Sequence, residues 1–240
     1  MRRKHQFDFK QFSIIQENTA MKVGTDGVLL GAWATVDAPE KVLDIGTGTG
    51  LIALMIAQRC NQCKIEAIDV SEAAAAEASM NFQVSPWSDR LSSKTISIQE
   101  LSNKKERHYY DLIISNPPYF EQGGTKAQSE GRQQARHNHT LSQEELLNSV
   151  NHLLTPQGKF SVILPYQEGL SLIEKSNDFE LFINRKTGFF SKERKPQERW
   201  LLEFSKVKKA PIEDSLIHYT PSNEWTTPYK LLTKDFYIKL

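Results

Sequence analysis

Short apolar runs alternate with segments of helical character over much of the 240-residue chain. The first run, residues 41–45, ends at a cluster of glycines and precedes an apolar segment, residues 51–57, of the kind that packs a helix against a sheet. The second run, residues 64–68, ends at an aspartate and precedes an alanine-rich segment. Because alanine is the best helix former, this segment predicts a helix from 72 to about 81.

The same alternation continues to about residue 205. Ser71 and Ser142 are the expected N-caps of two helices, and Glu145 completes a capping box with Ser142. The further expected strands are residues 95–98, 111–115, 159–164, 179–190 and 200–205, and the further expected helices are 142–154 and 166–176.

Strands that alternate with helices predict an α/β fold with a doubly wound, mostly parallel sheet and right-handed crossovers. We count seven strands, of which the last two lie too close for a crossover helix and should form an antiparallel hairpin. We expect one domain over residues 1–240. Residues 212–240 form a C-terminal extension, either a docked tail or a small addition to the body.

Composition places few limits on the partner. With 30 Lys and Arg against 29 Asp and Glu, the net charge is +1. Any binding of nucleic acid must therefore come from local basic patches. Such patches lie at residues 2–5, 185–195 and 206–209. No stretch approaches the roughly 20 apolar residues that span a bilayer, and no secretory signal is present, so we expect a cytoplasmic protein.

Cys60 and Cys63 are the only cysteines and have C-x-x-C spacing. No second Cys/His pair at zinc-finger spacing accompanies them, and they lie where a helix should end rather than begin. We therefore expect two ordinary reduced thiols and no metal site.

Three glycines follow the first strand. Gly46, Gly48 and Gly50 let the backbone turn sharply and let a ligand approach the free N–H groups of the next helix. The dinucleotide fingerprint is G-x-G-x-x-G, but here the third glycine comes one position early and Leu51 stands in its place. Asp69 has the place of an acid that binds ribose hydroxyls, a role shared by NAD and S-adenosylmethionine sites.

This part of the chain resembles the class I S-adenosylmethionine-dependent methyltransferases, whose first motif is similar to residues 42–50. The resemblance covers residues 24–205 and implies a Rossmann-like sheet that binds S-adenosylmethionine. It also implies that Asp69 binds the ribose and that Gln99 lies beside the adenine. Asp44 either contacts the amino group of the cofactor or caps the glycine turn with its own carboxylate.

Asn116, Pro117 and Tyr119 belong to an Asn-Pro-Pro-Tyr sequence directly behind an apolar strand. The lone pair of a planar amino nitrogen is delocalised, so a site that methylates it should accept hydrogen bonds from both N–H groups. The Asn116 side-chain oxygen and the Pro117 carbonyl can accept them, and Tyr119 can stack on the flat group. The alternative is a proline-stiffened turn, but the position at the end of the fourth strand favours catalysis by orientation and electrostatics.

The segment before the first strand contains Lys22, Thr25 and Asp26, followed by an apolar helix at residues 28–33. Thr25 or Asp26 is the expected helix cap. In the family that the chain resembles, residues 1–40 cover the cofactor and contribute to the substrate side, which implies that these three residues lie at its methionine end. The two roles are compatible.

The Asn-Pro-Pro-Tyr sequence leaves the substrate open among adenine N6 in RNA or DNA, guanine N2 in rRNA and glutamine N5 in protein, and a catalytically silent RNA-binding protein is the non-enzyme alternative. The chain is most similar to the bacterial tRNA1(Val) adenine-N6 methyltransferases, which act on the adenosine 3′ of the anticodon. This resemblance implies a tRNA partner, and we expect a monomer. It places the following residues near the substrate: Pro118, Phe120, Arg132, Arg136 and His137.

Overall fold

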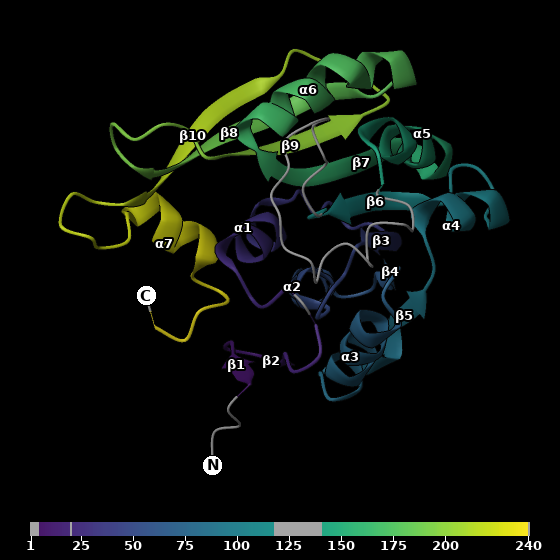
Figure 1. Cartoon of the computed structure of the whole chain (residues 1–240), viewed down its shortest axis with the longest axis horizontal. Helices are drawn as coiled ribbons and strands as arrows, with labels where there is room; N and C mark the ends of the chain where they lie inside the picture. Colours follow the sequence, from purple (N-terminus) through teal and green to yellow (C-terminus); the bar gives the residue numbers. More distant parts are fainter. Residues whose placement is uncertain (1–4, 20, 118–140, 240) are drawn as a thin grey trace, which may run out of the picture.

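A computed structural model describes residues 5–19, 21–117 and 141–239 (Figure 1). Its main sheet has eight strands in the order β10-β8-β9-β7-β6-β3-β4-β5. The strands of this sheet are β3 (Lys41–Ile45), β4 (Lys64–Asp69), β5 (Leu91–Thr95), β6 (Tyr110–Ser115), β7 (Leu154–Pro165), β8 (Phe182–Lys192), β9 (Arg199–Ser205) and β10 (Ile212–Tyr219). A separate antiparallel pair is formed by β1 (Gln6–Asp8) and β2 (Ser13–Ile15).

Helices cover both faces of the sheet. One layer consists of α1 (Thr25–Trp33), α2 (Leu51–Arg59), α3 (Glu72–Gln83) and α7 (Thr227–Thr233). The other consists of α4 (Ile98–Lys104), α5 (Gln143–Leu153) and α6 (Tyr166–Ser176). The described residues also include two short 3-10 helices, η1 (Ser88–Arg90) and η4 (Asn177–Phe179).

The sheet has a hydrophobic core on each face, because side chains alternate between the two faces along each strand. In β6, Leu112 and Ile114 join the core beneath α1 and α2, whereas Ile113 joins the core beneath α5. Successive residues of a strand point to opposite faces, so a run of apolar residues is buried on both sides. The fold-class prediction of a doubly wound, mostly parallel sheet with an antiparallel hairpin near the C-terminus is confirmed, since β8 and β9 pair antiparallel.

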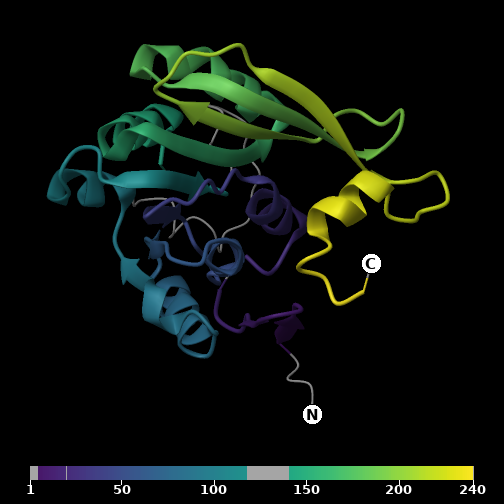
Figure 2. The same cartoon turned by 180° about the vertical axis from the view of Figure 1, so that it is seen from behind.

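The sheet has one strand more than the predicted seven. Residues 212–219 form β10, which pairs parallel with β8 at the edge of the sheet. The chain then returns through α7, which lies beside α1 in both views (Figures 1 and 2). Tyr237 stacks on Phe9 with ring centroids 6.0 Å apart, and the Lys10 backbone N–H donates to the Phe236 carbonyl (2.8 Å). The extension is therefore both a sheet addition and a docked tail.

Two local predictions were wrong. The third strand is Leu91–Thr95 rather than 95–98, because Ser97 caps α4 by accepting a hydrogen bond from the Glu100 N–H (3.2 Å). The sequence of β5 is polar, as suits an edge strand, and therefore lacks the apolar pattern by which a strand is predicted. Helix α1 begins at Thr25 with Gly24 as N-cap, so neither Thr25 nor Asp26 caps it. Asp26 instead accepts a hydrogen bond from Arg199 Nε of β9 (2.9 Å).

Two polar side chains of α3 hold the N-terminal segment over the sheet. The carboxylate of Glu77 is completely buried and accepts hydrogen bonds from the backbone N–H groups of Glu17 (2.7 Å), Asn18 (2.6 Å) and Thr19 (3.2 Å), and from the Thr19 hydroxyl. One turn later, Asn81 donates to the carbonyl of Ile15 and accepts from its N–H, both at 2.9 Å.

Burial alone would raise the pKa of Glu77, but the hydrogen bonds from Asn18, Thr19 and Glu17 outweigh desolvation and hold this pKa below its usual value. A carboxylate with a lowered folded-state pKa stabilises the fold above its unfolded-state pKa, and this contribution is lost as the pH falls through the folded-state value. Near neutral pH, Glu77 is therefore a stabilising anion.

We predict that Glu77→Gln lowers the free energy of unfolding by about 1–3 kcal/mol at pH 7. The amide would leave at least one of the buried N–H groups without an acceptor. Urea denaturation measures the effect. The matched control is Glu72→Gln at the exposed first turn of the same helix, where only the helix-dipole contribution of less than about 1 kcal/mol is lost. Equal losses in the two variants would contradict the role of Glu77.

Candidate active site

The glycine loop and the Asn-Pro sequence meet at one edge of the sheet. Strand β3 lies between β4 and β6 and pairs parallel with both, with Ile45 opposite Ile68 on one side and Ser115 on the other. The Ser115 hydroxyl also donates to the Ile45 carbonyl (3.0 Å). Gly46 follows Ile45 and Asn116 follows Ser115, so these two residues lie close together although 70 residues separate them in the sequence. They lie at the carboxyl edge, where open α/β sheets bind ligands.

The glycine loop needs its glycines for different reasons. Gly46, Gly48 and Gly50 have φ of 70°, 56° and 83°, a left-handed backbone that favours glycine. A Cβ on Gly50 would lie 2.5 Å from Phe82 Cε1 of α3, so this glycine allows close packing. A Cβ on Gly46 would meet no described atom within 4 Å, so no described residue packs against this glycine.

Asp69 organises the same loop. Its carboxylate accepts hydrogen bonds from the Gly48 N–H (3.0 Å) and the Ser71 N–H (2.9 Å). The side chain is half-exposed at the end of β4, and a carboxylate has about four acceptor positions. Asp69 therefore retains acceptor capacity for hydroxyl groups of a bound ribose, the role that the sequence predicts.

Asp44 is completely buried beneath the loop. One carboxylate oxygen accepts a hydrogen bond from the Thr47 hydroxyl (2.7 Å), and the other has no hydrogen-bond partner among the described residues. Desolvation raises the pKa of Asp44 to about 7, opposed by hydrogen bonds from the Thr47 hydroxyl and the Ala53 backbone and helped by the nearby charge of Asp69. The hydrogen bond from Thr47 agrees with the capping alternative of the sequence analysis.

The N-terminal segment reaches the loop from the side. The Thr19 methyl group lies 3.7 Å from the Cβ position of Gly48, and a Cβ on Gly27 would lie 3.1 Å from Leu51 Cδ2, which brings the first turns of α1 and α2 together. Thr25 and Asp26 are half-buried in that turn of α1. Lys22 is exposed and its ammonium donates to the Gln16 carbonyl (3.0 Å).

The remaining predicted residues fall into two groups. Asn116 is half-buried and Pro117 is buried at the end of β6, and Gln99 is half-buried in the first turn of α4, behind the carboxyl end of β5. The Ile96 N–H donates to the Asp69 carbonyl (3.0 Å), which brings that end of β5 to the site. Outside the described residues lie Pro118, Tyr119, Phe120, Arg132, Arg136 and His137.

Sequence reasoning missed Glu77 and Asn81. Asn81 also donates to the Thr49 carbonyl (2.8 Å), so α3 holds both the glycine loop and the segment above it. A signal was present, because these two polar residues are four apart on the face that carries the buried Ala74 and Ala78. Polar side chains on the buried face of an alanine-rich helix indicate a specific hydrogen-bonding task.

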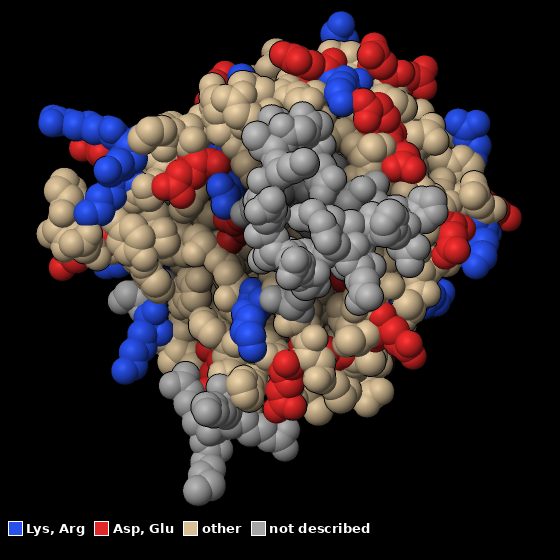
Figure 3. Space-filling view, in the orientation of Figure 1, with Lys and Arg blue, Asp and Glu red and all other residues tan. Residues whose placement is uncertain are grey.

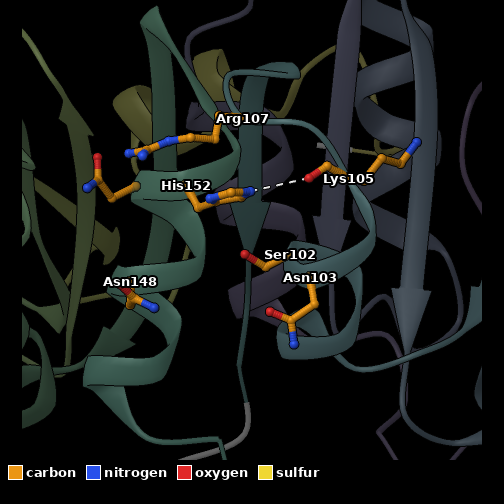
Figure 4. Close-up of a pocket in the computed structure, with 7 residues that line it drawn as sticks. Ser102, Asn103, Lys105, Arg107, Asn148 and His152 are labelled. Atoms are coloured by element: carbon orange, nitrogen blue, oxygen red, sulfur yellow. Dashed lines mark hydrogen bonds between the residues drawn. The ribbon is translucent and has the colours of Figure 1, made fainter.

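The cysteines and a polar pocket lie away from this edge. Cys60 and Cys63 are free and buried just after α2. A pocket of about 410 Å³ is lined by Arg107, Asn148 and His152 among others, at the edge where β6 and β7 begin (Figure 4). There His152 Nε2 lies 3.3 Å from the Lys105 carbonyl. Because this is the amino edge of the parallel strands, the pocket is separate from the candidate active site.

The residues at the carboxyl edge fit a nucleoside that carries a cationic group. Gly46 leaves room for a ligand, Asp69 can accept hydrogen bonds from ribose hydroxyls, and the unpartnered oxygen of Asp44 suits a positive charge. The first turn of α2 adds free N–H groups.

Comparison with known proteins agrees with this chemistry. The family model described as the methyltransferase small domain matches residues 23–176. The chain belongs to that family. A tRNA1(Val) (adenine(37)-N6)-methyltransferase of Bacteroides fragilis is 41% identical over 98% of both chains. The protein of the same name from Flavobacterium psychrophilum is 44% identical over 98% of this chain and 100% of its own.

Solved structures share the fold of this methyltransferase. A predicted O-methyltransferase from Agrobacterium tumefaciens superposes with a TM-score of 0.69, covering 88% of this chain and 96% of its own at 17% identity. In the part of the chain that the structure describes, no helix is long and apolar enough to span a membrane.

We predict that alanine at Gly50 mainly lowers stability, whereas alanine at Gly46 mainly weakens cofactor binding. Both variants place alanine in a left-handed backbone conformation, which lowers the free energy of unfolding by about 1–2 kcal/mol. Gly50→Ala also collides with Phe82 and should lower the free energy of unfolding by about 2–4 kcal/mol in total. Gly46→Ala meets no described atom, so it should weaken cofactor binding at least about tenfold with a smaller loss of stability.

Urea denaturation and calorimetric titration with S-adenosylmethionine measure these two quantities. Each variant is the control of the other, because the backbone strain is common to both. If Gly46→Ala binds the cofactor as tightly as the unsubstituted protein, the ligand does not approach the loop at this glycine.

We also predict that cofactor affinity depends on pH through Asp44. Because its pKa is raised to about 7, the carboxyl group is protonated below that value and can no longer balance a ligand cation. The affinity should fall by up to about tenfold for each pH unit below 7. Titrations between pH 5.5 and 7.5 measure it. The side chain at this position in the Asp44→Asn variant is neutral at every pH, so this variant should bind the cofactor weakly with an affinity that does not change with pH. If the affinities of the two proteins change with pH in parallel, Asp44 is not the group responsible.

Proposed function

We propose that this chain transfers the methyl group of S-adenosylmethionine to N6 of adenine 37 in tRNA1(Val). The observation that carries the proposal is the full-length similarity at 41–44% identity to enzymes named for that reaction. The geometry supports it, because Asn116 and Pro117 lie next to the glycine loop at the carboxyl edge of the sheet.

The glycine loop, Asp44 and Asp69 would hold the cofactor, which supplies an electrophilic methyl group when bound. Asp69 would receive the ribose hydroxyls. Asp44, whose second oxygen has no described partner, would face the amino group of the methionine part. We place Lys22, Thr25 and Asp26 at this end of the ligand because the first turns of α1 and α2 lie together, and Gln99 beside the adenine.

Asn116 and Pro117 would act on the amino group of the substrate. The Asn116 side-chain oxygen and the Pro117 carbonyl each accept one N–H, which localises the nitrogen lone pair and directs it at the methyl group. Since β6 is buried and paired on both sides, its end is rigid, and catalysis of this kind depends on rigid orientation. The roles of Tyr119 in stacking, and of Pro118, Phe120, Arg132, Arg136 and His137 in RNA contact, remain part of the same proposal.

An adenine in an anticodon loop is already partly unstacked. Moving it into a pocket therefore requires less free energy than flipping a base out of a duplex. This suits an enzyme in which residues 1–240 act as one domain, with residues 1–40 and 212–240 as extensions on the sheet.

We further propose that it acts as a monomer in the cytoplasm. Both sheet edges discourage pairing between copies, because β5 carries the exposed Ser92 and Lys94 and β10 the exposed Glu213 and Asp214.

We predict that the purified protein produces N6-methyladenosine in a tRNA1(Val) transcript, and that Asn116→Ala reduces this by at least about a hundredfold while cofactor affinity stays within about twofold. The reason is that Asn116 acts on the amino group of the substrate. The measurement uses labelled S-adenosylmethionine, nuclease digestion and identification of the methylated nucleoside.

Separate reactions with rRNA, DNA and protein serve as controls. N2-methylguanosine in rRNA, N6-methyladenine in DNA or N5-methylglutamine in protein as the main product would replace the proposed substrate. Cofactor binding without any methyl transfer would support a silent RNA-binding protein instead.

A further inference from the structure

The turn between β8 and β9 lies on the same edge of the sheet as Asn116. Strand β7 runs parallel to β6, with Val162 opposite Ser115, and continues to Pro165, which lies opposite Arg199 of β9. Arg199 in turn lies opposite Phe189 of β8. Residues 193–198, which join the two strands, therefore project from the carboxyl edge, toward which the arrowheads of β6 and β7 point in Figure 1.

The distance from the reaction site follows from strand spacing. Two to three strand intervals of about 4.8 Å separate β6 from the turn, or roughly 10–15 Å across the edge. Strand β8 also continues about six residues, or about 20 Å, beyond the level of Ser115, so the turn lies roughly 22–25 Å from the end of β6. A stacked nucleic-acid strand advances about 3.4 Å per nucleotide, so this distance corresponds to about seven nucleotides.

Residues 193–198 carry two cations, Arg194 and Lys195, and two exposed carboxylates, Glu193 and Glu198, so their formal charges cancel. Arg194 and Lys195 are exposed, and no ion pair in the described part of the chain involves either of them. Arg199 differs from them because it is paired with Asp26. Lys and Arg side chains gather at the left margin of Figure 3, where Figure 1 places this turn.

The turn is also held in place. The Lys195 N–H donates to the Lys192 carbonyl (3.1 Å), and the Glu198 N–H donates to the Phe189 carbonyl (2.9 Å). Arg194 has a left-handed backbone with φ of 69°. Because the backbone is ordered before binding, less conformational entropy is lost when its side chains contact a partner.

The turn lies outside the part of the chain shared by the general family. The methyltransferase small domain model ends at residue 176, before β8 begins. Residues that distinguish an RNA substrate from the other substrates of such domains are expected in the added parts. The β8–β9 turn is one added part at this edge, and the N-terminal segment before residue 23 is another.

We infer that Arg194 and Lys195 bind backbone phosphates of the RNA substrate about seven nucleotides from the target base. This inference rests on the proposed function, since it takes RNA as the substrate. A guanidinium group binds phosphate in a bidentate manner and an ammonium group as a point charge, and neither contact reads sequence. The pair therefore positions the RNA strand rather than selecting the base.

The test compares two double variants with the same change in charge. Arg194→Asn with Lys195→Gln removes the proposed contacts, and asparagine tolerates the left-handed backbone at position 194. Lys64→Gln with Lys104→Gln is the matched control, because these exposed lysines lie at the start of β4 and the end of α4, at the opposite edge of the sheet. Equilibrium binding of a tRNA1(Val) transcript is measured over a range of salt concentrations, with cofactor binding and thermal unfolding alongside.

We expect the 194/195 variant to bind RNA on the order of tenfold more weakly at 0.1 M salt, with the slope of log K against log salt reduced by about 1.5–2. Cofactor affinity and the unfolding temperature should not change. The control variant should retain at least most of the slope. An unchanged slope in the 194/195 variant, or equal losses in both variants, would overturn the inference.

The outcome separates this inference from the proposed function. If the protein methylates tRNA but the 194/195 variant binds RNA as tightly as the unsubstituted protein, only the phosphate contacts are refuted. RNA binding that depends on the pair, without formation of N6-methyladenosine, would support the contacts and refute the proposed reaction.

Discussion

Parallel pairing on both sides of β3 is the constraint on which the rest of the site depends. Ile45 lies opposite Ile68 and Ser115, so the ends of β3, β4 and β6 lie at one level. Asp69 is then the last residue of β4, and Gly46 and Asn116 are the first residues beyond β3 and β6. Gly46, Asp69 and Asn116 become neighbours for this reason, without any contact between their side chains being required.

Buried polar groups then shape the edge that the sheet has aligned. Asp69 holds the glycine loop through the Gly48 N–H, and Glu77 and Asn81 hold the N-terminal segment above it. Hydrogen bonds to a buried carboxylate are strong because little water competes for them, and a partly satisfied group would be destabilising. Against this background, the unpartnered oxygen of Asp44 marks the position where a ligand is expected.

Local signals explain which elements could be predicted. The helix at Ser71 and the capping box at Ser142 formed as expected because caps and alanine content act over a few residues. The strand at Leu91–Thr95 was misplaced because an edge strand needs few apolar residues. Strand β10 was missed because its exposed first residues carry no apolar alternation, and its pairing with β8 comes from a partner about 27 residues earlier in the chain.

The sequence by itself was enough to predict a glycine loop for a nucleoside cofactor and an Asn-Pro pair for a planar nitrogen, because backbone freedom and hydrogen-bonding capacity belong to the residue type. Only the tertiary structure decided which of these groups meet. It placed Asn116 beside Gly46, gave Glu77 its backbone partners and brought Arg194 and Lys195 to the catalytic edge. These outcomes depend on strand order and register, which arise from pairing between distant segments and are not encoded in any one of them.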